Sequence, residues 1–233
     1  MRAAVSIVIP TLNAAETLPG CLAALFEGLE AGAIRELVIA DGGSGDATLA
    51  IAEAAGAVVV QGAASRGGQL RQGAAAAKGD WLLFLHADTV LESGWSAAVL
   101  AHVATAPERA GYFRLRFDAG GVPARLVAGW ANLRARLFGL PFGDQGLLIS
   151  RDLHDRVGGF ADIELMEDVA MARALGRKRL AMLGAIARTS ARRYATEGWL
   201  RRGARNMGLQ LRFLSGAAPE RLARRYRRSG RRS

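Results

Sequence analysis

Polar side chains follow three apolar runs of the sequence, and their types suit binding of phosphates, cations and nucleobases. Thr11 and Asn13 come after the first run, Asp41 after the second, and His86 and Asp88 after the most apolar one. Each cluster alone is explained as well by turns and helix caps, which favour the same residue types. Carboxyl ends of parallel strands, however, meet at one sheet edge, where open α/β folds bind ligands. Together the clusters predict one binding site.

Side chains would have to carry the chemistry of this site, because the glycine-rich nucleotide motifs are absent. The sequence contains no G-x-x-x-x-G-K-[ST], and no G-x-G-x-x-G follows the first apolar run. Asp41 could accept a hydrogen bond from a uracil or guanine ring N–H. Arg66 and Arg71 could meet a base carbonyl or a phosphate. Asp88 could hold Mg²⁺ or Mn²⁺ against a diphosphate, since both cations prefer oxygen ligands.

A second acidic group, Glu167 and Asp168, is expected to open a helix. Acidic residues in a first helical turn are favourable through the helix dipole alone, so a purely structural role is open. An ionised carboxylate at this position can also remove the proton of an acceptor hydroxyl. The preceding glycine-rich loop contains Asp144 and Gln145, which could line the acceptor side or form an ordinary turn.

Positive charge is concentrated at the end of the chain. Of the net charge of +10, residues 188–233 contribute +12, from 14 arginines and two glutamates, and residues 1–187 contribute −2. Arg192, Arg193 and Arg201 belong to this segment and could form a solvated basic face.

The apolar residues of this basic tail leave several interpretations open. Leu209, Leu211, Phe213 and Leu214 lie among arginines, which suits an anionic membrane surface, an oligomer contact or a plain cap on the domain. Nucleic-acid binding is not expected, because no recognition motif accompanies the charge. The oligomeric state is not fixed by any of these features.

Strand and helix patterns alternate through the first half of the chain, which predicts an α/β fold with parallel pairing. Apolar or alternating runs predict strands over residues 5–9, 34–40, 57–60, 81–85, 111–117, 147–150 and 179–188. Helical spacing predicts helices up to residue 30 and over residues 46–56, 67–78, 93–105, 122–138, 166–175, 198–214 and 219–228. Asn13 and Glu16 would form the capping box of the first helix.

Composition excludes several other classes of protein. The length suits one sizeable core, and the single cysteine excludes an internal disulfide and a cysteine zinc cluster. No apolar run is long enough for a spanning helix, and no signal-peptide core is present, so a cytoplasmic location is expected.

Four ordered segments of the chain resemble glycosyltransferases of family 2. They are Val8-Ile9-Pro10-Thr11-Leu12-Asn13-Ala14-Ala15-Glu16, Asp41-Gly42-Gly43-Ser44-Gly45-Asp46, Phe84-Leu85-His86-Ala87-Asp88 and Glu167-Asp168. The resemblance covers residues 5–190 and implies the GT-A fold, a three-layer α/β/α sandwich with a mostly parallel central sheet. The chain is most similar to a short bacterial branch associated with arsenosugar-type biosynthesis.

The resemblance implies inverting transfer of a sugar, most simply a hexose, from a UDP- or GDP-sugar to an unidentified acceptor. It places Asp41 at the base, Thr11, Asn13 and Glu16 near the nucleoside, Asp88 on a divalent cation, and Asp168 as the general base with Glu167 beside it. In the family, a segment after the catalytic carboxylate often covers the diphosphate, and Arg192, Arg193 or Arg201 could do so here through charge-assisted hydrogen bonds.

Two positions depart from the family pattern. Gly42 stands where a second aspartate is frequent, and His86 stands where the family's D-x-D motif has its first carboxylate. His86 could contact the ribose, bind the cation as a neutral imidazole or have a structural role.

The resemblance also suggests how the chain is divided. The GT-A domain would occupy residues 1–190, with a nucleotide-binding half over 1–106 and an acceptor half over 107–190, and a basic helical extension would follow over 191–233. Two alternatives stay open. One is an enzyme peripheral to the inner face of a membrane, with a polyprenyl phosphate or carotenoid acid as its lipid acceptor. The other is a non-catalytic, arginine-rich binding module on the same scaffold.

Overall fold

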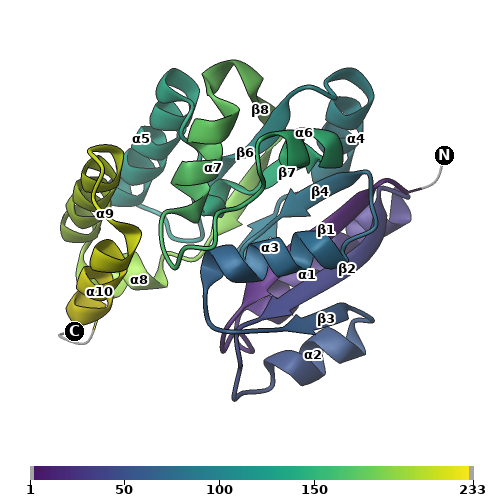
Figure 1. Ribbon diagram of the computed structural model, residues 1–233, viewed down its shortest axis with the longest axis horizontal. Coiled ribbons are helices and arrows are strands. Elements are labelled where there is room, and N and C mark those ends of the chain that lie inside the picture. The colour runs from purple at the N-terminus through teal and green to yellow at the C-terminus, as the bar shows by residue number, and fades with distance from the viewer. Residues whose placement is uncertain (1–2, 231–233) are drawn as a thin grey trace.

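The molecule is built around one eight-stranded sheet with the order β3-β2-β1-β4-β7-β6-β8-β5 (Figure 1). The computed structural model describes residues 3–230. The strands are β1 (Val5–Thr11), β2 (Ile34–Asp41), β3 (Val58–Gln61), β4 (Trp81–Phe84), β5 (Thr89–Leu91), β6 (Ala110–Phe117), β7 (Leu147–Ser150) and β8 (Leu180–Thr189). Strands β3, β2, β1 and β4 are parallel neighbours, as are β6 and β8. β7 runs antiparallel to β4 and β6, and β5 runs antiparallel to β8. The sheet is therefore parallel in its first half and mixed in its second.

Helices cover both faces of the sheet, so the expected three-layer α/β/α arrangement is confirmed. The helices are α1 (Leu18–Glu30), α2 (Thr48–Ala54), α3 (Arg66–Ala76), α4 (Trp95–Thr105), α5 (Val122–Phe138), α6 (Arg151–Arg156), α7 (Glu167–Leu175), α8 (Arg192–Glu197), α9 (Trp199–Leu214) and α10 (Pro219–Gly230), with the 3-10 turns η1 (Gly143–Gln145) and η2 (Arg177–Arg179). α1 and α4 pack on one face with Ile7, Leu83 and Trp95 in the core. α3, α6 and α7 pack on the other, around Val8 and Leu82. Neighbouring strand residues thus enter opposite cores, which explains the continuous apolar runs.

The loop after β1 differs from the predicted capping box. α1 begins only at Leu18, and Asn13 adopts a left-handed backbone conformation with φ of 50°. The backbone N–H of Asn13 donates to Ser44 Oγ at 2.8 Å, and its side-chain oxygen accepts from Gly45 N at 2.9 Å. Asn13 therefore ties the loop after β1 to the loop after β2, so its side chain is not available as a helix cap.

Three short elements, β5, α6 and α8, are not predicted from the sequence. They contain three, six and six residues. A period of 2 or 3.6 residues cannot be recognised over so few positions. β5 nevertheless matters for the architecture, because it closes the far edge of the sheet against β8.

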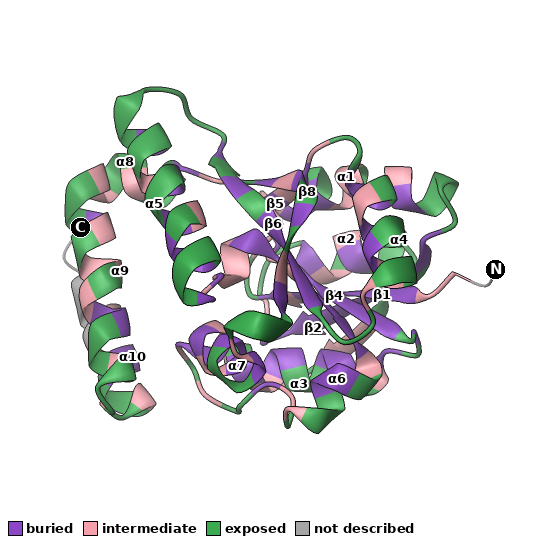
Figure 2. Cartoon of the chain, turned by 90° about the horizontal axis from the view of Figure 1, so that it is seen from above, coloured by how far each residue is buried: buried purple, intermediate pink, exposed green. Residues whose placement is uncertain are grey.

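The basic helices at the end of the chain pack against the domain (Figures 1 and 2). Tyr194 and Trp199 contact the alanine face of α5, and Leu209 and Leu222 form an apolar cluster with Met166 at the start of α7. The four apolar tail residues named in the sequence therefore differ in burial. Leu209 is buried and Phe213 half-buried in this cluster, whereas Leu211 and Leu214 are exposed. The domain boundary at residue 190 stays a prediction.

Over residues 3–230, no helix combines the length and the apolar character that crossing a bilayer would need.

Candidate active site

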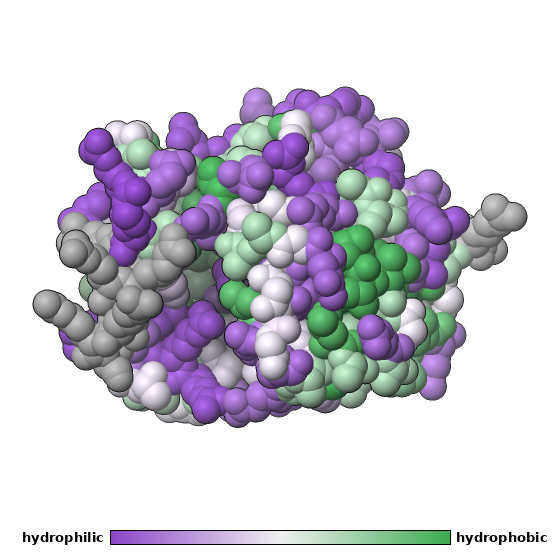
Figure 3. All heavy atoms as spheres, turned by 60° about the horizontal axis from the view of Figure 1, so that its bottom comes forward, coloured by the Kyte–Doolittle hydropathy of each residue, from purple (hydrophilic) through white to green (hydrophobic). Residues whose placement is uncertain are grey.

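A cleft of about 740 Å³ opens where β1, β3 and β4 end. In Figure 3 the surface is hollowed toward the left of the view, and hydrophilic side chains lie beside the hollow. The predicted residues that line the cleft are Thr11, Asn13, Glu16, Arg66, His86, Asp88, Asp144, Glu167, Asp168, Arg192 and Arg193. The structure thus gathers residues from both halves of the sequence around one space.

Asp41 does not line this cleft, although it follows β2 at the same sheet edge. Its side chain is fully buried, and it accepts hydrogen bonds from Thr11 Oγ1 at 2.8 Å, Ser44 Oγ at 2.6 Å and the backbone N–H groups of Gly43 and Ser44. Burial alone would raise the pKa of Asp41, but these hydrogen bonds lower it overall. In this arrangement Asp41 holds Thr11 and the turn after β2 in place, and its contact with a base stays a prediction.

Three further predicted residues lie away from the cleft surface. Arg71 is exposed on α3, and Arg201 is exposed on α9. Gln145 is completely buried, and its side-chain amide donates to the carbonyl oxygen of Phe113 at 3.2 Å. Gln145 therefore anchors η1 to the sheet, and its neighbour Asp144 is the residue of that pair that reaches the cleft.

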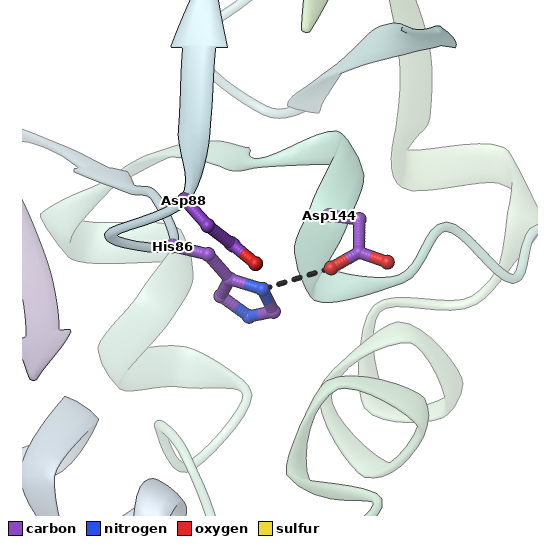
Figure 4. A group of neighbouring side chains, drawn as sticks. All are labelled: His86, Asp88 and Asp144. Carbon is purple, nitrogen blue, oxygen red and sulfur yellow. Dashed lines mark hydrogen bonds and ion pairs between the residues drawn. The ribbon is translucent and has the colours of Figure 1, made fainter. Parts of the chain in front are cut away.

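His86, Asp88 and Asp144 form a group that we call the cation corner (Figure 4). One ligand atom from each lies within 4.8 Å of the others, and His86 Nδ1 is 2.9 Å from Asp144 Oδ1. Burial would raise the pKa of Asp144, but the hydrogen bond to His86 and the charges of His86, Arg66 and Arg193 lower it to about 2. Two carboxylates and an imidazole are donors that divalent cations accept. The residues therefore fit a divalent cation.

Glu167 and Asp168 form a second acidic group, the base corner, at the start of α7. Asp168 is half-buried, and its Oδ2 accepts a hydrogen bond from the backbone N–H of Gly143 at 2.9 Å. Glu167 is 2% exposed and lies 3.7 Å from Arg66 Nε. Burial, and then the charge of Asp168, raise the pKa of Glu167 to about 7. Of the two carboxyl groups, Asp168 is the one that the solvent of the cleft reaches more readily.

Two consecutive residues of η1 connect the corners. Gly143 donates its N–H to Asp168, and Asp144 contacts His86. A Cβ atom on Gly143 would lie 2.2 Å from His86 Nε2, so only glycine allows the imidazole to approach the turn this closely. The relative position of the two corners is therefore set by one short turn.

Arg134, a residue that sequence reasoning missed, supports this turn from α5. Its guanidinium lies 3.3 Å from the centroid of the Phe142 ring, and its Nε donates to the carbonyl oxygen of Leu140 at 3.0 Å. Burial lowers the pKa of Arg134 to about 10. Its sequence neighbourhood contains many arginines, so nothing in the sequence distinguished this one.

Arg66 lies between the two corners. Burial lowers its pKa, but the charge of Glu167, followed by those of Asp144, Asp168 and Asp88, raises it overall. The side chain, at the start of α3, is 42% exposed and also lines the cleft. A permanent cation in this place can balance carboxylates when the cleft is empty and a phosphate when it is filled.

The C-terminal helices form the remaining wall of the cleft. On α9 and α10, the cleft is lined by Arg202, Asn206, Leu209, Gln210 and Tyr226, which the sequence reasoning did not assign to the site. The first four recur on one face of α9, a helical spacing that could have indicated them. Across the mouth of the cleft, Arg192 on α8 forms an ion pair with Glu16 after β1. Residues of the basic tail therefore line the cleft together with residues from the rest of the chain.

Comparisons with known proteins agree with this architecture. The family described as Glycosyl transferase family 2 matches residues 6–161. A PGL/p-HBAD biosynthesis glycosyltransferase of Mycobacterium bovis is 39% identical over 106 residues, which are 42% of this chain and 40% of that protein. A PGL/p-HBAD biosynthesis glycosyltransferase of Mycobacterium tuberculosis matches equally well. The match thus covers less than half the length of these relatives.

Solved structures share the fold at low sequence identity. S. aureus TarS 1-349 superposes with a TM-score of 0.63 and 17% identity, over 90% of this chain and 65% of that one. Glucosyl-3-phosphoglycerate synthase from Mycobacterium tuberculosis, solved with Mn²⁺, UDP and glucosyl-3-phosphoglycerate, gives 0.54 and 22%, over 80% and 70% of the two chains. The GT-A fold implied by the resemblance is confirmed, whereas the association with arsenosugar biosynthesis stays a prediction. Because the family match extends over more than half of the chain, the chain belongs to glycosyl transferase family 2.

Proposed function

We propose that the protein transfers a sugar, with inversion, from a nucleoside diphosphate donor to an acceptor hydroxyl. The observation that carries the proposal is the joining of the cation corner and the base corner by η1 in one cleft. Relatives of the same fold support it, since TarS was solved with UDP-GlcNAc and glucosyl-3-phosphoglycerate synthase with Mn²⁺ and UDP-glucose.

The donor would lie across the sheet edge. Thr11 and Asn13 line the nucleoside end, and Arg66, Arg192 and Arg193 supply guanidinium groups for the phosphates. His86, Asp88 and Asp144 would hold the cation, Mg²⁺ or Mn²⁺, which neutralises charge on the diphosphate when it is bound.

Asp168 would act as the general base. Its half-buried carboxylate faces the cleft, and the N–H of Gly143 fixes its orientation. As the acceptor oxygen forms its bond to the anomeric carbon, its proton moves to Asp168. The bond from that carbon to the diphosphate breaks on the opposite side, and its electron pair leaves with the diphosphate. Attack opposite the leaving group inverts the anomeric centre. Glu167, enclosed beside Arg66, would adjust the charge around this base.

Calorimetry with UDP and GDP, with and without Mn²⁺, tests the donor site. We expect one nucleotide to bind tightly only with Mn²⁺, and Asp88→Ala to abolish that binding. Asp152→Ala, an exposed aspartate in α6, is the matched control and should bind as the wild type does. Absence of nucleotide binding in the wild type would favour the non-catalytic module. A thermal-shift panel of nucleotide sugars then identifies the donor, and thereby narrows the search between a small-molecule and a lipid acceptor.

A further inference from the structure

Helix α5 presents its large apolar side chains to solvent and its small ones to the protein. Val122, Leu126, Trp130, Leu133 and Leu137 recur every three or four residues, and their exposed fractions are 59, 64, 47, 46 and 47%. Apart from Arg134, the residues buried against the domain are alanines: Ala124, Ala128, Ala131 and Ala135. A solvent-facing helix normally has the opposite pattern, with its apolar stripe on the core side. The outer face of α5 therefore suits an apolar or interfacial environment.

Helix α9 carries a second exposed apolar stripe. Leu200, Met207, Leu211 and Leu214 are 82, 43, 61 and 36% exposed. α9 contacts α5, and both helices lie at the same end of the molecule (Figures 1 and 2). We call the two stripes together the outer face. An exposed set of large apolar residues on neighbouring helices marks an interaction surface more often than an isolated exposed leucine does.

The charge on these helices indicates the kind of partner. Neither α5 nor α9 contains an aspartate or a glutamate. Exposed arginines accompany the apolar stripes: Arg125 and Arg136 on α5, and Arg201 and Arg212 on α9. An apolar stripe beside arginines is the pattern of helices that lie in the interface of an anionic membrane.

We propose that the outer face docks the protein onto an anionic membrane surface. A second copy of the chain fits less well, because a symmetric contact would bring arginines together without acidic partners on either helix. Nucleic acid would use the arginines but would leave the apolar stripes without a role. On an anionic membrane, the leucines and Trp130 enter the headgroup region while the arginines contact lipid phosphates. This docking does not depend on the proposed reaction.

Vesicle sedimentation of the full chain tests the proposal. We expect binding to vesicles of phosphatidylcholine mixed with phosphatidylglycerol, weak binding to phosphatidylcholine alone, and weakening by salt. Leu126→Glu should lower the partition coefficient by about tenfold or more, because it removes an apolar side chain that docking would bury and adds a charge of the same sign as the lipid. Leu29→Glu is the matched control. It makes the same change at a 53% exposed leucine on α1, which lies away from the outer face, and should leave binding unchanged.

Tryptophan fluorescence gives an independent readout. Trp130 is 47% exposed, Trp199 is half-buried against the cluster that contains Phe117, and Trp81 and Trp95 are buried. Docking should therefore shift the emission to the blue, and Trp130→Phe should remove most of that shift. Absence of sedimentation with anionic vesicles would overturn the proposal, as would equal losses in Leu126→Glu and Leu29→Glu. Light scattering without lipid adds a third check. A dimer that Leu126→Glu dissociates would assign the outer face to a second copy instead.

Discussion

The cation corner and the base corner both contain carboxyl groups, but their surroundings shift the pKa of a carboxyl group in opposite directions. At the cation corner, the pKa of Asp144 falls to about 2, because His86 and neighbouring arginines outweigh burial. At the base corner, burial and the adjacent Asp168 raise the pKa of Glu167 to about 7. Pairs of acidic groups whose pKa values are driven apart mark different roles in one site. The surroundings of Asp144 thus favour its ionised form, whereas those of Glu167 favour its neutral form.

The two corners also respond to pH in opposite directions. Asp144 has a lowered pKa, so its contribution to stability is present above its unfolded value of 3.8 and is lost as pH falls through about 2. Glu167 has a raised pKa, so its contribution is complete below 4.5 and is lost as pH rises through about 7. Of these two carboxyl groups, only Glu167 is close to its titration near neutral pH.

The largest effect is expected from removing the proposed general base, Asp168. Asp168→Asn keeps the hydrogen bond from Gly143 but cannot take a proton, so transfer should fall by about 10²- to 10⁴-fold. UDP or GDP binding with Mn²⁺ should be unchanged, because the cation corner is intact. Initial rates and calorimetry on the same preparation measure the two quantities. Asp155→Asn, at a 65% exposed position on α6, is the matched control. Transfer at the wild-type rate in Asp168→Asn would show that Asp168 is not the base.

The next effect concerns the stability of the base corner. Glu167→Gln removes a buried group that is costly to ionise, so the variant should gain up to about 3 kcal/mol in free energy of unfolding above pH 7, relative to the wild type. Near pH 4 that advantage should vanish, because Glu167 is then protonated. Urea unfolding at both pH values measures the difference. A difference independent of pH would mean that Glu167 does not titrate as its environment implies.

A smaller effect is expected at the cation corner. Asp144→Asn keeps a side-chain oxygen near His86 but removes the negative charge, so Mn²⁺-dependent nucleotide affinity should fall by about 10- to 100-fold. Nucleotide affinity measured without Mn²⁺ should change much less. Asp168→Asn serves as the control from the other corner. Equal losses of affinity in both variants would show that Mn²⁺-dependent nucleotide binding does not depend on the cation corner specifically.

The sequence predicts the first half of the fold well, because buried parallel strands leave continuous apolar runs. The sequence also locates the polar residues at the ends of β1 and β4, because they stand where these apolar runs stop. Asp41 illustrates the limit of that reasoning. Its place after β2 is predicted correctly, but its hydrogen bonds to Thr11 and Ser44 turn it inward, and only the structure shows this.

The second half of the site depends on contacts that no local pattern contains. Asp144 meets His86 because β7 enters the sheet antiparallel beside β4 and thereby brings η1 over the end of β4. Arg134 stacks on Phe142 from a helix whose buried face is otherwise alanine, so nothing marks it in the sequence. Such long-range pairings are decided by topology, whereas capping and strand signals are decided by a few neighbouring residues.

Helix α9 has one face in the cleft and another on the outer face. Arg202, Asn206 and Gln210 line the cleft, while Leu200 and Leu211 face solvent. If a bound donor and a docked membrane favour the same placement of α9, the coupling between them is necessarily reciprocal. If the membrane raises the affinity for the donor by a certain factor, the donor raises the affinity for the membrane by the same factor. A single helix would then make sugar transfer conditional on where in the cell the enzyme resides.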